Sequence, residues 1–327
     1  MTAEVAVRRA GGLPRLVALR LVAGLGVLLA VSAIVFTATE LAPGDAATAA
    51  LGPDSDPASV VAMRTELGLD RPAVVRYLDW LWGAVGGDFG VSYVSHRPVS
   101  DVIAERAGNT ALLGGLAVVL LVPLAIGLGV WSALRAGRAA DRIVSGATLG
   151  LVSVPEFVIG TVLVVVFAVQ LGVLPAVSFV PPGQQPLDSP EILVLPVVTL
   201  LAVCLAHNVR LVRAGVREVS AGDAAENARL NGVPEHRVVL RYVLPSALPP
   251  ALPIFCRYAG FLLGGALIAE TMFGYPGLAS ALVTASAGRD VPVVQAVALV
   301  AAAVTVLLNL LGDVLAVLLD PKRGVTR

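Results

Sequence analysis

The sequence predicts an all-α integral membrane protein with six transmembrane helices, on the basis of its composition and its apolar runs. Of the 327 residues, 57% are hydrophobic and 14% are charged, whereas soluble domains are about 25% charged. Six apolar runs reach the roughly 20 residues that a helix needs to cross a bilayer. Two long polar segments separate some of these runs. We expect them to form a small extracytoplasmic subdomain after the first span and a cytoplasmic helix between spans four and five.

The six predicted spans divide the chain into four regions. The spans cover residues 16–39, 110–134, 143–173, 192–212, 252–272 and 293–319. The first is longer than the apolar core of about 7–15 residues in a signal peptide, so we expect it to be retained. The regions are an N-terminal tail with the first span (1–39), an extracytoplasmic subdomain (40–109), a core bundle of five spans (110–319) with a polar loop (213–250), and a cytoplasmic tail (320–327).

The uneven distribution of arginine among the connections predicts the orientation. Cytoplasmic loops carry an excess of Lys and Arg. Four segments are rich in them: Arg8, Arg9 and Arg15; Arg135, Arg138 and Arg142; Arg210, Arg213, Arg217, Arg229, Arg237 and Arg241; Lys322, Arg323 and Arg327. The short alternate connections contain no basic residue between 175 and 191, and Arg289 between 273 and 292. We therefore expect a multi-pass protein of the cytoplasmic membrane with both termini in the cytoplasm.

The segment 40–109 is predicted to fold outside the membrane. It also carries arginines, but long loops translocate largely regardless of charge. Residues 74–85 fit a helix with Tyr77, Trp80 and Trp82. Because Trp and Tyr are enriched where the membrane meets water, Trp80, Trp82 and Tyr93 form either an interfacial belt or a binding surface.

The segment 218–250 is a polar, arginine-bearing island between apolar runs. Such a segment must leave the bilayer, because unpaired charges and polar backbone are costly in hydrocarbon. Alanines at 224, 225 and 228, followed by Gly232 as a stop and Pro234 beyond it, predict a short surface helix. Such a helix either docks a soluble protein or lies on the lipid surface. Its weak apolar face favours docking, because a lipid-bound helix has a wide apolar face with flanking cations.

Four polar residues within or at the ends of the predicted spans are candidates for a translocation path. They are Glu156, Glu270, Asn309 and Asp313. Glu156 follows a helix-breaking proline, Glu270 closes the fifth span, and the last two lie four residues apart on one face of the sixth. Ionisable residues in spans are costly and often functional. The alternative for each is a polar contact between helices.

The sequence contains no pattern typical of an enzyme, a metal site or a nucleic-acid-binding surface. It lacks the Gly-x-x-x-x-Gly-Lys phosphate loop. His96, His207 and His236 are scattered without a nucleophile partner or metal-ligand spacing, and Cys204 and Cys256 lie in apolar runs as small core residues do. The formal net charge is zero, so we expect no nucleic-acid partner.

The polar island resembles the cytoplasmic loop of ABC importer membrane subunits. That loop carries Glu-Ala-Ala, a Gly four residues later, and then Ile-x-Leu-Pro. Here Glu226, Asn227, Ala228 and Gly232 match the first part, and Leu244-Pro245 the second. Asn227 replaces an alanine of the motif and Tyr242 its isoleucine. The resemblance implies contact with an ATPase through a set of coupling residues: Asp223, Glu226, Asn227, Ala228, Gly232, Leu244 and Pro245.

Most of the chain is similar to the oligopeptide, dipeptide and nickel class of bacterial ABC importer permeases. The similarity rests on short phrases in order along the chain, at 41–46, 67–72, 87–92, 109–110, 153–157, 174–175, 270–273, 276–278, 289–295, 309–313 and 320–321. The long segment after the first span resembles the first of the two permeases that such systems carry.

The resemblance implies a set of partners and a transport reaction. The partners are a second permease subunit, two ATP-binding subunits, an extracytoplasmic substrate-binding protein and the surrounding lipid. ATP and Mg²⁺ would be used by the ATP-binding subunits, and this chain would bind no cofactor. Di- or oligopeptides are the expected substrates, with nickel or another small solute as the alternative. The rival from another class is a secondary transporter without ATPases, which often has matched interrupted half-helices.

Overall fold

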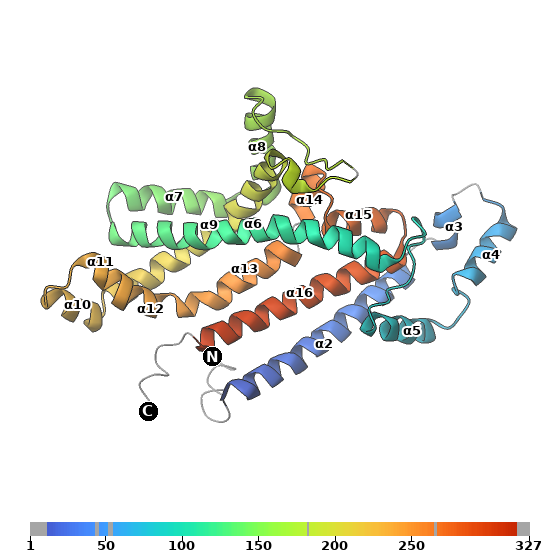
Figure 1. Ribbon diagram of the computed structural model, residues 1–327, viewed down its shortest axis with the longest axis horizontal. Helices are drawn as coiled ribbons and strands as arrows, with labels where there is room; N and C mark the ends of the chain where they lie inside the picture. The colour runs from blue at the N-terminus through green and yellow to red at the C-terminus, as the bar shows by residue number, and fades with distance from the viewer. Residues whose placement is uncertain (1–11, 43–45, 52–54, 182, 265–266, 319–327) are drawn as a thin grey trace.

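The computed structural model describes residues 12–42, 46–51, 55–181, 183–264 and 267–318, and helices dominate these ranges (Figure 1). The first half contains α2 (Gly12–Leu41), α3 (Ala46–Leu51), α4 (Pro57–Glu66), α5 (Ala73–Val85), α6 (Val99–Leu134), α7 (Ala139–Ser153), α8 (Glu156–Leu163) and the π-helical η1 (Val164–Gln170). The second half contains η2 (Pro186–Asp188), α9 (Glu191–Ser220), α10 (Asp223–Leu230), α11 (Glu235–Val238), η3 (Val239–Val243), α12 (Leu244–Ala247), η4 (Pro249–Ala251), α13 (Leu252–Gly264), α14 (Leu267–Phe273), α15 (Leu278–Ala287) and α16 (Val291–Leu318).

The described helices confirm an all-α integral membrane protein. Five helical segments are long and apolar enough to cross a membrane, and a bent pair of helices brings the number to six if it counts as one span. The five segments are Pro14–Leu41, Val99–Leu134, Glu191–Ser220, Glu235–Phe273 and Val291–Leu315. The number of spans therefore depends on the bent pair.

The bent pair corrects the expectation of one continuous third span over 143–173. Helix α7 ends at Ser153 and α8 begins at Glu156, with an angle of 107° between the two arms. The cause is Pro155, which has no N–H to donate and disfavours helical backbone at the residue before it. Val154 accordingly has extended dihedrals of −102° and 129°. Figure 1 shows α8 turned away from the long axis of the bundle.

The helical run that contains the predicted fifth span begins well before position 252. The helical run starts at Glu235 and passes through η3, α12 and η4 into α13. Pro245 lacks the N–H that would bond the carbonyl of Arg241, and the helix just before it is π-helical. Much of the polar loop is therefore a helical extension of the fifth span.

Helix α9 is the centre of the bundle. In the most apolar 18-residue stretch of α9, 67% of the residues are buried, whereas 11% are buried in the corresponding stretch of α2. Helices α6, α7 and α8 pack on α9, and Gly129 allows α6 to approach closely. A Cβ atom at Gly129 would lie 2.7 Å from Cβ of Val212, so a small residue is needed there.

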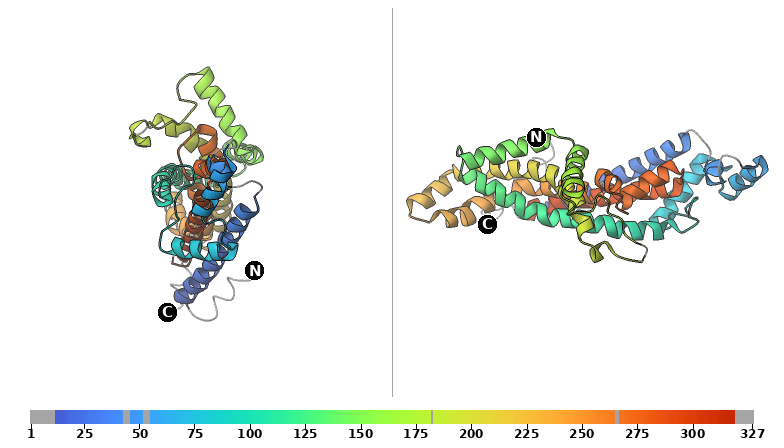
Figure 2. Two further views of the ribbon diagram at one scale, coloured as in Figure 1. Left: turned by 90° about the vertical axis from the view of Figure 1, so that its right-hand side faces the viewer. Right: turned by 90° about the horizontal axis from the view of Figure 1, so that it is seen from above.

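Helices α2 and α16 form an antiparallel pair beside this core. At one end Gln295 donates a hydrogen bond to Thr39 over 2.9 Å, and at the other Arg20 pairs with Asp313 over 2.8 Å. The start of α2 and the end of α16 therefore lie at the same end of the bundle. Figures 1 and 2 show that α10 is also at this end, and that α3, α4 and α5 lie at the opposite end. We call these the α10 end and the α5 end.

Some sequence expectations lie outside the described residues. These are the arginines at 8 and 9, positions 43–45 of the phrase at 41–46, and the tail 320–327 with its basic residues.

The contact between α2 and α16 makes a prediction about packing. A Cβ atom at Gly24 would overlap Val306, whereas one at Gly26 would meet nothing within 4 Å. We expect Gly24→Val to lower the stability of the purified protein by about 1–3 kcal/mol, the usual effect of overpacking. Gly26→Val is the matched control on the same helix and should change little. Thermal unfolding in detergent measures both, and equal effects would contradict this packing.

Candidate functional site

Helix α10 is the short surface helix predicted within the polar island. Asp223 and Glu226 lie in its first turn and Arg229 in its last, so the charges complement the helix dipole. Ala225 and Ala228 are 1% and 6% exposed and pack into the main core. The helix is thus seated on its own subunit by two small side chains.

Arg229 fixes α10 to the elements before and after it. Its guanidinium donates to the carbonyl and the hydroxyl of Ser220, at the end of α9, over 2.8 and 2.7 Å. It also donates to both carboxylate oxygens of Glu235, at the start of α11, over 2.8 and 2.9 Å. Bidentate pairs of this kind impose a defined geometry. The hydrogen bonds to Glu235 raise the pKa of Arg229 above its ordinary value, so the anchor stays charged.

The turn after α10 requires Gly232. Its N–H donates to the carbonyl of Arg229 over 2.9 Å, and the N–H of Val233 donates to Ala228 over 3.0 Å. This pair of bonds is a Schellman motif, in which the residue after the C-cap is left-handed. Gly232 has φ +74°, a conformation that costs other residues about 1–2 kcal/mol.

The remaining surface of α10 is exposed and partly acidic. Asp223, Glu226, Asn227 and Leu230 face outward, and the Leu230 side chain is 78% exposed. Ala228 was one of the residues expected to contact an ATPase, but it packs against its own chain. Because Ala228 is buried in its own chain, it positions the helix and cannot itself contact a partner.

The other two coupling candidates lie at the base of the α13 run. Leu244 is half-buried against the core, and Pro245 is exposed in the first turn of α12. They belong to the same end of the bundle as α10, and η3, just before them, contacts α10. The structure therefore groups all seven coupling candidates in one region.

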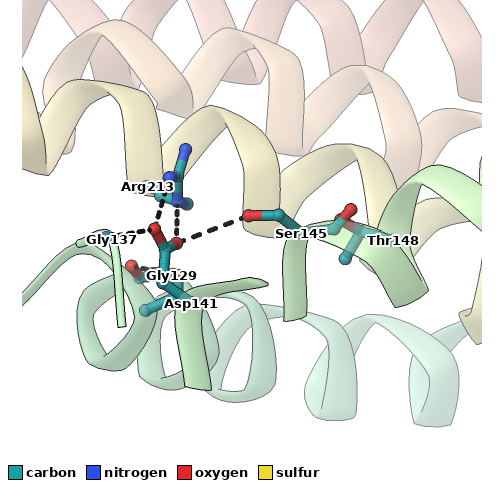
Figure 3. A network of polar contacts seen from close by, with 7 residues as sticks. Gly129, Gly137, Asp141, Ser145, Thr148 and Arg213 are labelled. Carbon is teal, nitrogen blue, oxygen red and sulfur yellow. Dashed lines mark hydrogen bonds and ion pairs between the residues drawn. The ribbon is translucent and has the colours of Figure 1, made fainter. Parts of the chain in front are cut away.

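A second polar contact at this end joins α7 to α9 (Figure 3). Nε and Nη2 of Arg213 donate to the two carboxylate oxygens of Asp141 over 2.6 and 2.9 Å. The N–H of Gly137 donates to the same carboxylate over 2.9 Å, and the hydroxyl of Ser145 over 3.4 Å. The Asp141 side chain is 7% exposed, so the pair is largely shielded from water.

A buried carboxylate organises the α5 end. Glu270, at the end of the fifth span, is fully buried. One of its oxygens accepts the hydroxyl of Thr110 over 2.7 Å. The other accepts the N–H groups of Ala279 and Ser280, over 2.8 and 3.1 Å. These are the second and third residues of α15, so Glu270 caps α15 from a different helix.

The segment before α15 is held by α6 as well. Nδ2 of Asn109 donates to the carbonyl of Pro276, and the Tyr275 hydroxyl donates to the carbonyl of Asn109, each over 2.9 Å. The hydroxyl oxygen of Thr110 also accepts the N–H of Leu278 over 2.8 Å. Three separate sequence phrases, at 109–110, 270–273 and 276–278, therefore converge on one network.

For Glu270 this network supports the alternative that the sequence left open, a polar contact between helices. The residue borders a cavity of about 790 Å³, lined also by Arg106, Gln184 and Thr284. Both of its oxygens are already bonded within the chain, however. Its role in the structure is to hold α15 against α6 beside that cavity.

Asp313 is likewise a contact between helices. It pairs with Arg20 of α2, which is the alternative that the sequence left open. Asn309, one turn earlier on α16, is exposed. Glu270 and Asp313 lie at opposite ends of the bundle, so the four path candidates do not form one site.

Glu156 is different from the other candidates. It is the first residue of α8, just after the bend. One of its carboxylate oxygens is buried and has no hydrogen-bond partner among the described residues. Asn208 of α9 is fully buried, and its carboxamide oxygen also has no hydrogen-bond partner among the described residues.

Comparison with known proteins identifies the family. A family model described as "Binding-protein-dependent transport system inner membrane component" matches residues 125–325, and the model of its N-terminal part matches residues 13–114. The chain belongs to this family. It is a multi-pass inner-membrane permease of the peptide and nickel class of ABC importers, and it is not itself an enzyme.

Individual relatives agree with the family match. The glutathione transport system permease proteins GsiC of Escherichia coli strain K12, Shigella dysenteriae serotype 1 and Shigella boydii serotype 4 are each 36% identical to this permease over 302 residues. The match covers 92% of this chain and 96% of each relative. Membership of an ABC importer family excludes the secondary-transporter alternative.

Sequence reasoning missed three residues of these sites. Asp141 was not singled out, and Arg213 was read only as part of a basic cluster, because their contact joins positions 72 residues apart. Asn208 lies within the fourth predicted span. The rule that flags polar residues in spans would have found it.

The capping of α15 makes a prediction about Gly277. A Cβ atom there would overlap the carboxylate of Glu270. We expect Gly277→Ala to push that carboxylate off the N–H groups of α15 and to lower stability by about 1.5–3 kcal/mol, the range for hydrogen bonds to charged groups. Gly115→Ala, where the added Cβ meets nothing within 4 Å, is the control. Thermal unfolding that ranks the two variants equally would contradict the cap.

The contact between α7 and α9 makes a prediction about coupling of two side chains. We expect Asp141→Asn and Arg213→Gln each to lower stability by about 2 kcal/mol. The double variant should lose far less than the sum, because both changes remove one shared interaction. The exposed pair Arg97 and Glu105, 3.5 Å apart, is the control and should contribute at most about 1 kcal/mol. Additive effects of the Asp141 and Arg213 changes would refute a direct contact.

Proposed function

We propose that this permease is the first of two permeases in an importer for small peptides, and that it is driven by two cytoplasmic ATP-binding subunits. The observation that carries the proposal is the geometry of α10. This short helix is fixed to Ser220, to Glu235 and to the core of its own subunit, and it keeps one face exposed. The partners are the second permease, the two ATP-binding subunits and an extracytoplasmic substrate-binding protein. ATP and Mg²⁺ act on the ATP-binding subunits, and this chain binds no cofactor.

The geometry of α10 supports a coupling role. Arg229 bonds Ser220 of α9 and Glu235 of α11, so α10 moves together with the helices on both sides. Its exposed residues Glu226 and Asn227 are free to meet a partner surface. Packed interfaces of this kind switch between discrete arrangements and convert nucleotide binding into rigid-body motion.

The orientation follows from this role. Because ATP is hydrolysed in the cytoplasm, α10 must face the cytoplasm. The start of α2 and the end of α16 lie at the same end as α10, which supports cytoplasmic N- and C-termini. The region 40–109, with α3, α4 and α5, would then lie on the outer side as a separate subdomain. The basic residues Arg135, Arg138 and Arg142, around the connection between α6 and α7, agree with this orientation, because cytoplasmic loops carry an excess of Lys and Arg.

A peptide of a few residues is the proposed substrate class. The similar permeases are named for glutathione transport, and glutathione is a tripeptide. A free peptide carries an ammonium group, and the partnerless oxygen of Glu156 would suit such a donor. Nickel or another small solute is the second candidate, and competition for uptake distinguishes them. Unlabelled tripeptides should reduce uptake of a labelled peptide, whereas competition by Ni²⁺ alone would favour the second candidate.

The coupling role predicts the effect of a change at Gly232. We expect Gly232→Asp to abolish ATP-dependent uptake in vesicles holding the complete importer, while the chain stays in the membrane at its normal level. An aspartate at position 232 cannot adopt φ +74° without strain. Its carboxylate also puts a charge beside the exposed face of α10. Gly87→Asp is the control, since Gly87 has φ +82° and open space around it.

Purification separates the possible outcomes. A gentle detergent pull-down of the wild-type chain should recover a second permease and ATP-binding subunits with ATPase activity. Normal uptake by Gly232→Asp would contradict coupling through α10. Recovery of the chain alone, even after crosslinking, would contradict the proposed assembly.

A further inference from the structure

Helix α5 has two different faces. Val74, Leu78, Trp82 and Val85 are 69%, 55%, 81% and 78% exposed. Their spacing of four, four and three residues places them on one side of the helix. Tyr77 and Trp80, on another side, are half-buried. A continuous apolar stripe therefore faces away from the protein.

The position of α5 relative to the membrane is set by its contacts with α2. The Tyr77 hydroxyl shares a hydrogen bond of 2.9 Å with Ser32, and its ring packs edge-on against Phe36 at 5.2 Å. Arg76 pairs with Glu40, one residue before the end of α2. The helix therefore lies beside the last three turns of a membrane span.

The depth of this contact can be estimated from the helix rise. The apolar run of the first span ends near Thr39, and Ser32 lies seven residues before it. At 1.5 Å per residue this is about 10 Å below the end of the apolar run. Interfacial amphipathic helices bury their apolar face about 5–10 Å into the boundary between headgroups and acyl chains. The two depths agree.

We propose that the stripe Val74, Leu78, Trp82 and Val85 is inserted into the leaflet of the bilayer at the α5 end. Its occupant is lipid, because the stripe continues an apolar surface that already belongs to a span. At the same level of α2, Ile34 and Leu41 are 66% and 76% exposed.

The polar features of α5 agree with this placement. Trp82 is the most exposed residue of the stripe, and Trp is enriched where acyl chains meet headgroups. Arg71, just before α5, pairs over 2.5 Å with Asp79, which is exposed on the flank of the helix next to the stripe. In the proposed arrangement this charged pair faces the headgroups and water. Inserted in this way, helix α5 fixes the position of the subdomain 40–109 relative to the bilayer surface.

Nitroxide labels on the assembled importer in lipid nanodiscs test the proposal. Single cysteines are introduced as Val74→Cys and Val85→Cys on the stripe, and as Asp79→Cys for the matched control on the same helix. The background carries Cys204→Ala and Cys256→Ala. Collision of each label with oxygen, which concentrates in lipid, is compared with collision with a water-soluble nickel chelate.

The three possible results separate lipid from other occupants. We expect the collision ratio to shift toward oxygen at 74 and 85, and toward the chelate at 79. Labels at 74 and 85 that collide with the chelate would place the stripe in water. Immobile labels shielded from both reagents would place it against a partner protein. Either of these results overturns the proposal.

A measurement without cysteine substitution provides a second test. The fluorescence of Trp82 is obtained as the difference between the wild-type importer and Trp82→Phe. We expect brominated acyl chains to quench this difference signal and iodide in water to leave most of it. Quenching by iodide alone, or by neither reagent, would contradict insertion even if the cysteine variants failed to assemble.

Discussion

The last turns of α9 hold together helices that are distant in the sequence, and the geometry of the α10 end depends on them. Arg213 binds Asp141 of α7 in a bidentate ion pair. At Val212, the residue before Arg213, α9 packs against Gly129 of α6 so tightly that a Cβ atom there has no room. Ser220, the last residue of α9, receives the guanidinium of Arg229 from α10. Because α9 is also the most buried of the candidate spans, a displacement of α10 must be shared with α6 and α7.

This arrangement links the small surface helix α10 to the whole bundle. Close-packed interiors have low compressibility and transmit displacement instead of absorbing it. At the α10 end the contacts are charge pairs at helix ends, which can hold elements together while they tilt. At the α5 end the carboxylate of Glu270 accepts three hydrogen bonds, one from Thr110 of α6 and two from the start of α15, and the Thr110 hydroxyl oxygen accepts a fourth from the N–H of Leu278. The two ends are therefore fastened by separate sets of contacts.

Local elements, which depend on neighbouring residues, were predicted from the sequence. Contacts between residues that are distant in the sequence were missed. The helix at Asp223–Leu230 and its stop at Gly232 follow from local composition, and both were found. The side of that helix on which Ala228 lies is decided by packing against distant residues, so the expected partner contact was wrong. The ion pair of Asp141 and Arg213 joins positions 72 residues apart, a distance at which periodicity carries no information. Pro155 was seen within a predicted span, but its bend of 107° was not.

The four polar candidates can now be ranked by whether their bonds are satisfied. Glu270 and Asp313 have partners within the chain, so packing alone accounts for their presence in apolar surroundings. Glu156 has a buried oxygen without a partner among the described residues, and burying such a group costs free energy that packing does not offset. A structural role would leave this cost unexplained. A donor from the proposed second permease or from the proposed solute would remove it, which makes Glu156, at the bend, the best supported of the four path candidates.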